Sequence, residues 1–154
     1  MKKIIITCLV LLICSGCHKE ADNKQFDIYS SLKENLSTIT SFSKDYPFQV
    51  NLTFKKWENK YLYNIIIDQP KVDMYNIVAM AYANEKEEQM CPTLGIFDKD
   101  TYSLRVGYVD KSKGFYKGIQ LSGECDNKQS IHLFVQYYTD EEMKDKVEKY
   151  IEVK

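Results

Sequence analysis

The sequence is poor in the residues from which most enzyme sites are built. It contains two histidines, His18 and His132, and no H-E-x-x-H metal motif. No G-x-S-x-G segment marks a nucleophilic serine, and the six glycines form no glycine-rich phosphate loop. We therefore expect a non-enzymatic protein without a metal or other cofactor. The weaker alternative is an enzyme in which His132 works with a cysteine or an acid.

Positive charge is also limited. The chain has 21 basic and 22 acidic residues, and Arg105 is its only arginine. Nucleic-acid binding needs a basic surface, so this balance argues against a nucleic-acid partner. For Arg105 the default expectation is an ordinary salt bridge across neighbouring strands.

Long apolar runs are absent except for one at the start of the chain. Residues 4–14 are apolar apart from Thr7, follow Lys2-Lys3, and precede the small residues of Ser15-Gly16-Cys17. As a helix, this run rises roughly 16 Å at about 1.5 Å per residue. That is about half of the ~30 Å needed to span a hydrocarbon core. The pattern is typical of a secretory signal peptide.

The segment Ser15-Gly16-Cys17 resembles the lipobox of bacterial lipoproteins. The resemblance implies cleavage before Cys17 and a lipid on its thiol, although Cys14 stands where an aliphatic residue is usual. It predicts a signal peptide at residues 1–16, a lipidated tether at 17–25 and one globular domain at 26–154. The mature protein would be extracytoplasmic and held on the cell membrane or the outer membrane by its lipid.

Only two cysteines remain unassigned after processing. On this resemblance, Cys8 and Cys14 would leave with the signal peptide, and Cys17 would carry the lipid. Cys91 and Cys125 lie in a compartment that permits disulfides. A bond between them would close a loop of about 35 residues and contribute roughly 3–4 kcal/mol in the chain-entropy model. The alternative is two separate thiols.

The mature chain begins with a helical pattern. Leu32, Leu36 and Ile39 recur near the 3.6-residue period, which predicts a helix starting at residues 22–23 and ending before Tyr46-Pro47. Near the C-terminus, the capping-box pattern at residues 139–142 predicts a second, short helix. The alternative there is a short edge strand that includes residues 150–153.

Between these helices the pattern favours strands. Alternating or continuous apolar residues predict strands at 48–55, 61–68, 74–83, 94–97, 102–108, 115–125 and 131–137. Residues 74–83 are apolar at nearly every position, so this strand is expected to be central, with a helix as the alternative. The whole predicts a mainly β fold: an antiparallel β-sandwich with an N-terminal helix and a short C-terminal helix. The alternative is an α+β antiparallel sheet covered by helices.

Tyrosine is the one residue in suggestive excess, with 12 in the chain. Tyr116 and Tyr138 fall off the main core faces of their strands, so they are candidates for a surface that recognises a glycan, peptide or protein. The alternative is that tyrosine is simply a good strand residue. The sequence thus favours a lipid-anchored binding module of unknown ligand. The alternative is a structural or assembly subunit of an envelope complex.

Overall fold

The protein is mainly β and has one long helix. The computed structural model describes residues 17–83 and 90–154, with side chains from residue 23 onward. The predicted signal peptide, residues 1–16, lies outside the described residues. The elements are α1 (Cys17–Thr38), β1 (Gln49–Trp57), β2 (Lys60–Asp68), β3 (Tyr75–Tyr82), β4 (Thr93–Leu94), β5 (Ser103–Leu104), the 3-10 turn η1 (Lys111–Lys113), β6 (Phe115–Tyr116), β7 (Gly118–Cys125), β8 (Ile131–Tyr138) and β9 (Lys146–Val153).

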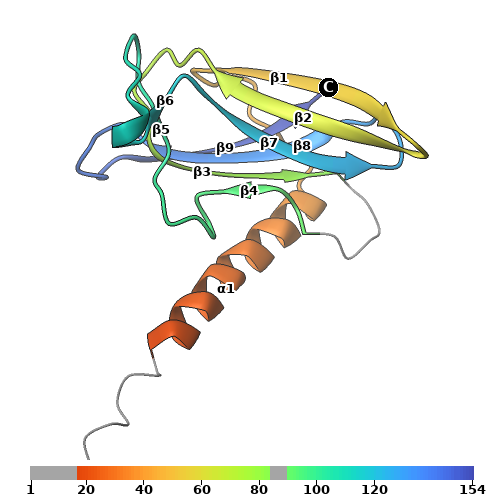
Figure 1. Ribbon diagram of the computed structural model, residues 1–154, viewed down its shortest axis with the longest axis horizontal. Helices are drawn as coiled ribbons and strands as arrows, with labels where there is room; N and C mark the ends of the chain where they lie inside the picture. Colours follow the sequence, from red (N-terminus) through yellow and green to blue (C-terminus); the bar gives the residue numbers. More distant parts are fainter. Residues whose placement is uncertain (1–16, 84–89) are drawn as a thin grey trace, which may run out of the picture.

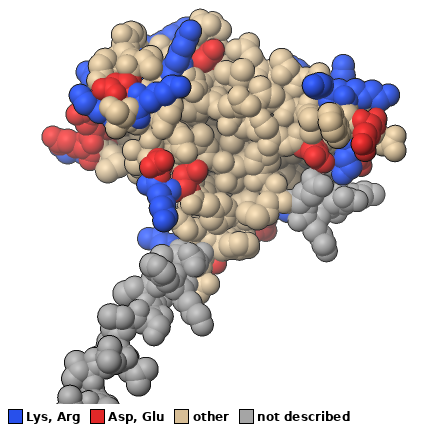
Figure 2. Space-filling view, in the orientation of Figure 1, with Lys and Arg blue, Asp and Glu red and all other residues tan. Residues whose placement is uncertain are grey.

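Two antiparallel sheets pack face to face as a sandwich, which confirms the predicted fold class (Figure 1). We call the sheet with strand order β1-β2-β7 the open sheet, and the sheet with order β4-β3-β8-β9 the covered sheet. A short parallel pair, β5-β6, lies at one end. Charged side chains gather at the two ends of the molecule and leave a largely uncharged surface between them (Figure 2).

The core lies between the two sheets and follows from the alternation of side chains along each strand. On the open sheet, Ile65 and Ile67 of β2 are fully buried. Across from them, Ala79 and Leu133 of the covered sheet belong to the same cluster. The predicted central strand is confirmed, because β3 pairs with β4 on one side and with β8 on the other.

Helix α1 covers the outer face of the covered sheet. Tyr29 and Leu36 of the helix pack with Met80, Ile96 and Phe134 in a second cluster. The helix begins at Cys17, within the range predicted as a tether, and its N-terminal turns extend away from the sheets (Figure 1). It ends at Thr38, earlier than the proline-based prediction. In the described part of the chain, no helix is long and apolar enough to cross a membrane.

The predicted C-terminal helix is wrong. Residues 146–153 instead form β9, which pairs with β8 over its whole length. The Asp140 carboxylate accepts hydrogen bonds from the amides of Lys144 and Asp145, so it closes a turn rather than capping a helix. Val153 and Ile151 alternate into the core, and this burial in a sheet overrides the local capping-box signal.

Three predicted strands are shorter than expected, and the strand predicted at 94–97 is reduced to β4. The strand at 102–108 is reduced to β5, because the chain turns back at Arg105–Tyr108, where Gly107 has φ of 68°. The strand at 115–125 is divided at Lys117. Its first part, β6, pairs in parallel with β5, and its second part, β7, joins the open sheet. Both breaks lie at the same end of the sandwich.

Candidate interaction surface at the loop end

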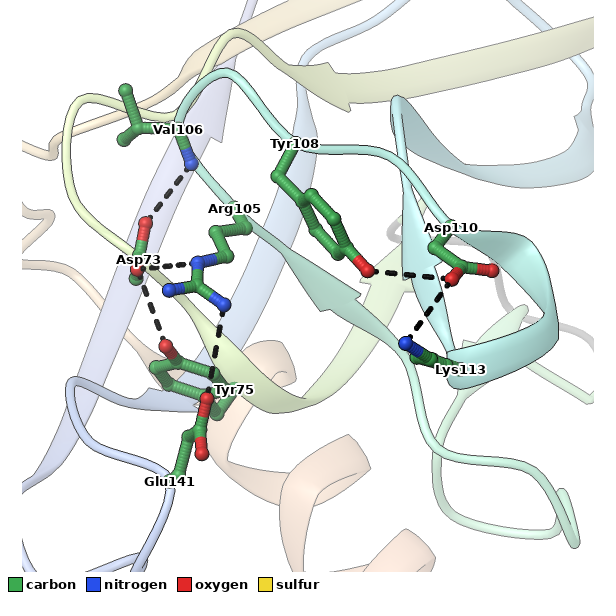
Figure 3. A network of polar contacts seen from close by, with 8 residues as sticks. All are labelled: Asp73, Tyr75, Arg105, Val106, Tyr108, Asp110, Lys113 and Glu141. Carbon is green, nitrogen blue, oxygen red and sulfur yellow. Dashed lines mark hydrogen bonds and ion pairs between the residues drawn. The ribbon is translucent and has the colours of Figure 1, made fainter.

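Three connections meet at one end of the sandwich, beside the β5-β6 pair. They are residues 69–74 between β2 and β3, residues 105–114 between β5 and β6, and residues 139–145 between β8 and β9. We call these three segments the loop end. Salt bridges and hydrogen bonds join them into one network of polar contacts (Figure 3).

Asp73 is the centre of this network. Its carboxylate accepts hydrogen bonds from the Val106 amide at 2.9 Å and from the Tyr75 hydroxyl at 3.2 Å. It also pairs with Arg105, whose Nε lies 3.3 Å away, while a terminal nitrogen of Arg105 lies 3.9 Å from Glu141 (Figure 3). The salt bridge expected for Arg105 is therefore present. It links loops rather than neighbouring strands, and together these contacts join all three segments of the loop end.

Aromatic rings pack beneath the network. Phe115 makes edge contacts with Tyr75, at a centroid distance of 6.1 Å, and with Tyr108, at 5.3 Å. The Arg105 guanidinium lies 5.5 Å from the centroid of the Tyr108 ring. Burial raises the pKa of Tyr75, and its hydrogen bond to Asp73 adds to this effect. Tyr75 therefore remains a neutral donor, which suits its bond to a carboxylate.

Two further aspartates hold the loops themselves. The Asp110 carboxylate accepts from the hydroxyl and the amide of Ser112, at 2.6 and 3.1 Å, and so caps η1. The hydrogen bonds from Ser112 lower the pKa of Asp110. In the same way, the amide of Asp145, followed by that of Lys144, lowers the pKa of Asp140. Both carboxylates are charged at neutral pH and fix the backbone of their loops.

Exposed apolar side chains stand on these ordered loops. Val106, Val109 and Met143 are each more than half exposed, at 53%, 54% and 52%, and Val72 is 39% exposed. Exposed apolar side chains are unfavourable in water, so several of them on neighbouring, ordered loops suggest a contact surface. Because Asp73, Asp110 and Asp140 already fix the loops, little conformational entropy would be lost on binding.

The structure does not bring Tyr116 and Tyr138 together. Tyr116 is half-buried, packs against the core between the sheets and stacks on Tyr102 at 5.3 Å. Tyr138 lies on the outer face of β8, since its neighbour Tyr137 is in the core, and it pairs in register with Tyr75. Both tyrosines therefore lie next to the loop end, Tyr116 in β6 and Tyr138 directly before residues 139–145, but on different faces.

His132 contacts the helix. Its Nδ1 donates a hydrogen bond to the Leu36 carbonyl at 2.8 Å, and its ring packs on Phe42 and Tyr82. Glu152 is its partner in register on β9. These contacts attach the C-terminal turn of α1 to the covered sheet. Among the described residues, no group of three or more potential ligands is gathered as a metal site.

The two remaining cysteines belong to different clusters. Cys125 is fully buried between the sheets, whereas Cys91 packs on the helix side, and its amide donates to the Tyr29 hydroxyl at 2.8 Å. The structure describes both as thiols, so the suggested disulfide is not part of it. Burial raises the pKa of the Cys91 thiol. Cys17 is the first residue of α1, its side chain is not among those described, and its lipidation stays a prediction.

Sequence reasoning missed most of the loop end. The alternation of residues 102–108 was interpreted as one strand, which placed Val106 toward the core, whereas this valine is exposed. Arg105 was the one available signal, since a single arginine among many lysines suggests a position that needs its forked geometry. No family model, no curated protein and no solved structure matches the chain.

Proposed function

We propose that this protein is a lipid-anchored, extracytoplasmic module that binds a partner protein through the loop end. The observation that carries the proposal is the set of four exposed apolar side chains, Val72, Val106, Val109 and Met143, on loops already fixed by polar contacts. The same loops carry the Arg105–Glu141 ion pair, and apolar anchors with charged neighbours are the usual composition of a protein interface.

The length of α1 suits the anchored part of this proposal. The helix is described from Cys17 onward, and the ring of Phe26 already packs on Phe97, with 6.0 Å between the ring centroids. The nine residues before Phe26 rise about 14 Å at about 1.5 Å per residue. A lipid on Cys17 would therefore hold the domain away from the membrane on a helical spacer, within reach of other envelope proteins.

Photo-crosslinking in living cells tests the loop end. A photoreactive residue replaces Val109, and a matched variant carries it at Asn59, an exposed position in the β1-β2 turn. We expect a discrete higher-mass adduct from position 109 but not from position 59. Val106→Asp should abolish that adduct, because a buried, unpaired carboxylate opposes binding. The same adduct from both positions, or none from position 109, would contradict the proposal.

Metabolic labelling with radioactive palmitate tests the anchor separately. We expect label in the wild-type protein and none in Cys17→Ala, since the thioether requires the thiol of Cys17. Equal labelling of the two proteins would exclude lipidation at this residue.

A further inference from the structure

The outer face of the open sheet is uncovered and mostly uncharged at its centre. Helix α1 contacts β3 and β8 of the other sheet, and among the described elements none lies on this face (Figure 1). Thr53, Asn64 and Ser122 form one row across its three strands, and Asn51, Ile66 and Gln120 form the next. We call Thr53, Asn64, Gln120 and Ser122 the polar ladder. They line a shallow groove of about 630 Å³.

We propose that the polar ladder binds a neutral oligosaccharide. Two of its amides are held in place: the Ser122 hydroxyl donates to Asn64 Oδ1 at 2.9 Å, and Gln120 Nε2 donates to the Ser122 hydroxyl at 3.0 Å. These bonds orient the Asn64 amino group and the Gln120 carbonyl. A fixed donor beside a fixed acceptor suits sugar hydroxyls, which both donate and accept.

Apolar groups on the same face complete the site. Leu62 and Ile66 are half-buried on either side of Asn64 along β2, where they can contact the C–H faces of a sugar ring. Trp57 is 56% exposed and lies on this face two rows beyond Thr53, in register with Lys60. At about 3.3 Å per residue, this ring is ~13 Å along the strand from the ladder, within the span of an oligosaccharide. An indole presents a broad apolar ring face.

The charges of the face favour a neutral ligand. Lys55 and Glu124 flank Leu62 in a single row, so the two charges at this place have opposite sign. The two rows of the polar ladder contain no charged residue. Lys60, in register with Trp57, pairs with Glu124 at 3.9 Å, so an anionic polymer would gain little net attraction here, whereas sugar hydroxyls would find amides and a hydroxyl. This surface is separate from the loop end, so either proposal can fail without the other.

Calorimetry on the mature, lipidated protein tests the proposal. The protein is kept in a detergent without a sugar headgroup and titrated with oligomers of N-acetylglucosamine, oligomers of glucose and, as an anionic probe, polygalacturonate. We expect at least one neutral probe to bind with Kd of about 1 mM or lower, and the anionic probe to bind more weakly. Asn64→Ala and Ser122→Ala should each weaken that binding at least about fivefold, and Trp57→Ala about threefold.

The control variant is Asn59→Ala, which removes an exposed amide from the β1-β2 turn outside the ladder. It should bind as the wild type does, and circular dichroism should show that every variant keeps its fold. Three results would overturn the proposal: no binding of either neutral probe, tighter binding of the anionic probe, or unchanged binding in both ladder variants. The last of these would place any saccharide site elsewhere on the molecule.

Discussion

The two sheets share one core, yet their outer faces are opposite in character. The covered sheet presents Met80 and Phe134 outward, and α1 buries both. The open sheet presents Asn64 and Ser122 at the corresponding places, and they remain accessible. Among the described elements, a helix covers the sheet whose central outward residues are Met80 and Phe134, and none covers the sheet whose central outward residues are Asn64 and Ser122. The polarity of the side chains on the outer face of each sheet therefore indicates which sheet is packed against a helix.

The largest effect is expected from a pair of Leu→Ala substitutions, one between the helix and the covered sheet and one on the outer face of the open sheet. Leu36 lies beneath α1 with no exposed surface, whereas Leu62 is half-buried on the open sheet. Leu36→Ala should lower the free energy of unfolding by about 2–5 kcal/mol, because it leaves a cavity. Leu62→Ala should lower it by about 1 kcal/mol or less. Urea unfolding of both variants gives the comparison, and equal losses would mean that α1 is not part of the cooperative unit.

A second test compares the inner and outer faces of one strand, β7. At Gly123 a Cβ would lie 2.5 Å from the Tyr63 hydroxyl and 2.6 Å from the ring carbon that carries it. Gly123→Ala should therefore lower the free energy of unfolding by about 1–3 kcal/mol. Ser122→Ala, one residue away on the outer face, should change it by about 0.5 kcal/mol or less. Urea unfolding measures both.

The steric cause can be isolated in a double-mutant cycle. In a Tyr63→Leu background the ring that opposes the new methyl group is gone, so Gly123→Ala should cost clearly less than in the wild type. The same cost in both backgrounds would mean that the loss arises in the backbone of β7. The interpretation that Gly123 makes room for Tyr63 would then be wrong.

The sandwich could be predicted because its signals are local. The alternation along β1 and β2 and the continuous apolar run of β3 each lie within ten residues, and each strand formed as predicted. The prediction of a C-terminal helix was wrong because the capping-box signal is local, whereas the structure of this segment depends on its pairing with β8. Pairing with β8 buries Ile151 and Val153, and a short helix could not match that burial.

The loop end could not be predicted because its contacts join distant segments. Asp73 meets the Val106 amide across 33 positions of sequence, and Arg105 meets Glu141 from another loop. No spacing rule connects such residues before the sheets are in place. The polar ladder is intermediate between these cases: its three strands were predicted from local patterns, but only the register of β1, β2 and β7 sets its residues side by side.

A third prediction concerns residues 69–74, the connection that leads from β2 of the open sheet to β3 of the covered sheet. Asp73→Asn keeps the shape of the side chain but removes its charge toward Arg105, so the free energy of unfolding should fall by about 1 kcal/mol. The matched control is Glu124→Gln, which breaks the exposed pair with Lys60 within the open sheet and should cost about 0.5 kcal/mol or less. Thermal unfolding of both variants measures the difference, and a larger loss in the control would contradict the role of Asp73.

The smallest expected effect is a difference between the loops and the two sheets in how their hydrogen-exchange protection responds to acid. The pKa values of Asp110 and Asp140 are lowered in the folded protein, by hydrogen bonds from Ser112 and from the Asp145 amide respectively. A carboxyl whose pKa is lowered in the folded protein stabilises the fold at pH values above its unfolded pKa of about 3.9, and this contribution is lost as the pH falls through the folded pKa.

Hydrogen-exchange protection at the amides of Ser112 and Asp145 should therefore decrease below about pH 4. Protection at Ile65, whose strand is paired on both sides in the open sheet, should persist to lower pH. Asp110→Asn should remove the pH dependence at Ser112 but not at Asp145, because each carboxylate holds only its own loop. Loss of protection at Ile65 in the same pH range would instead mean that acid unfolds the sandwich as a whole, with no separate step at the loop end.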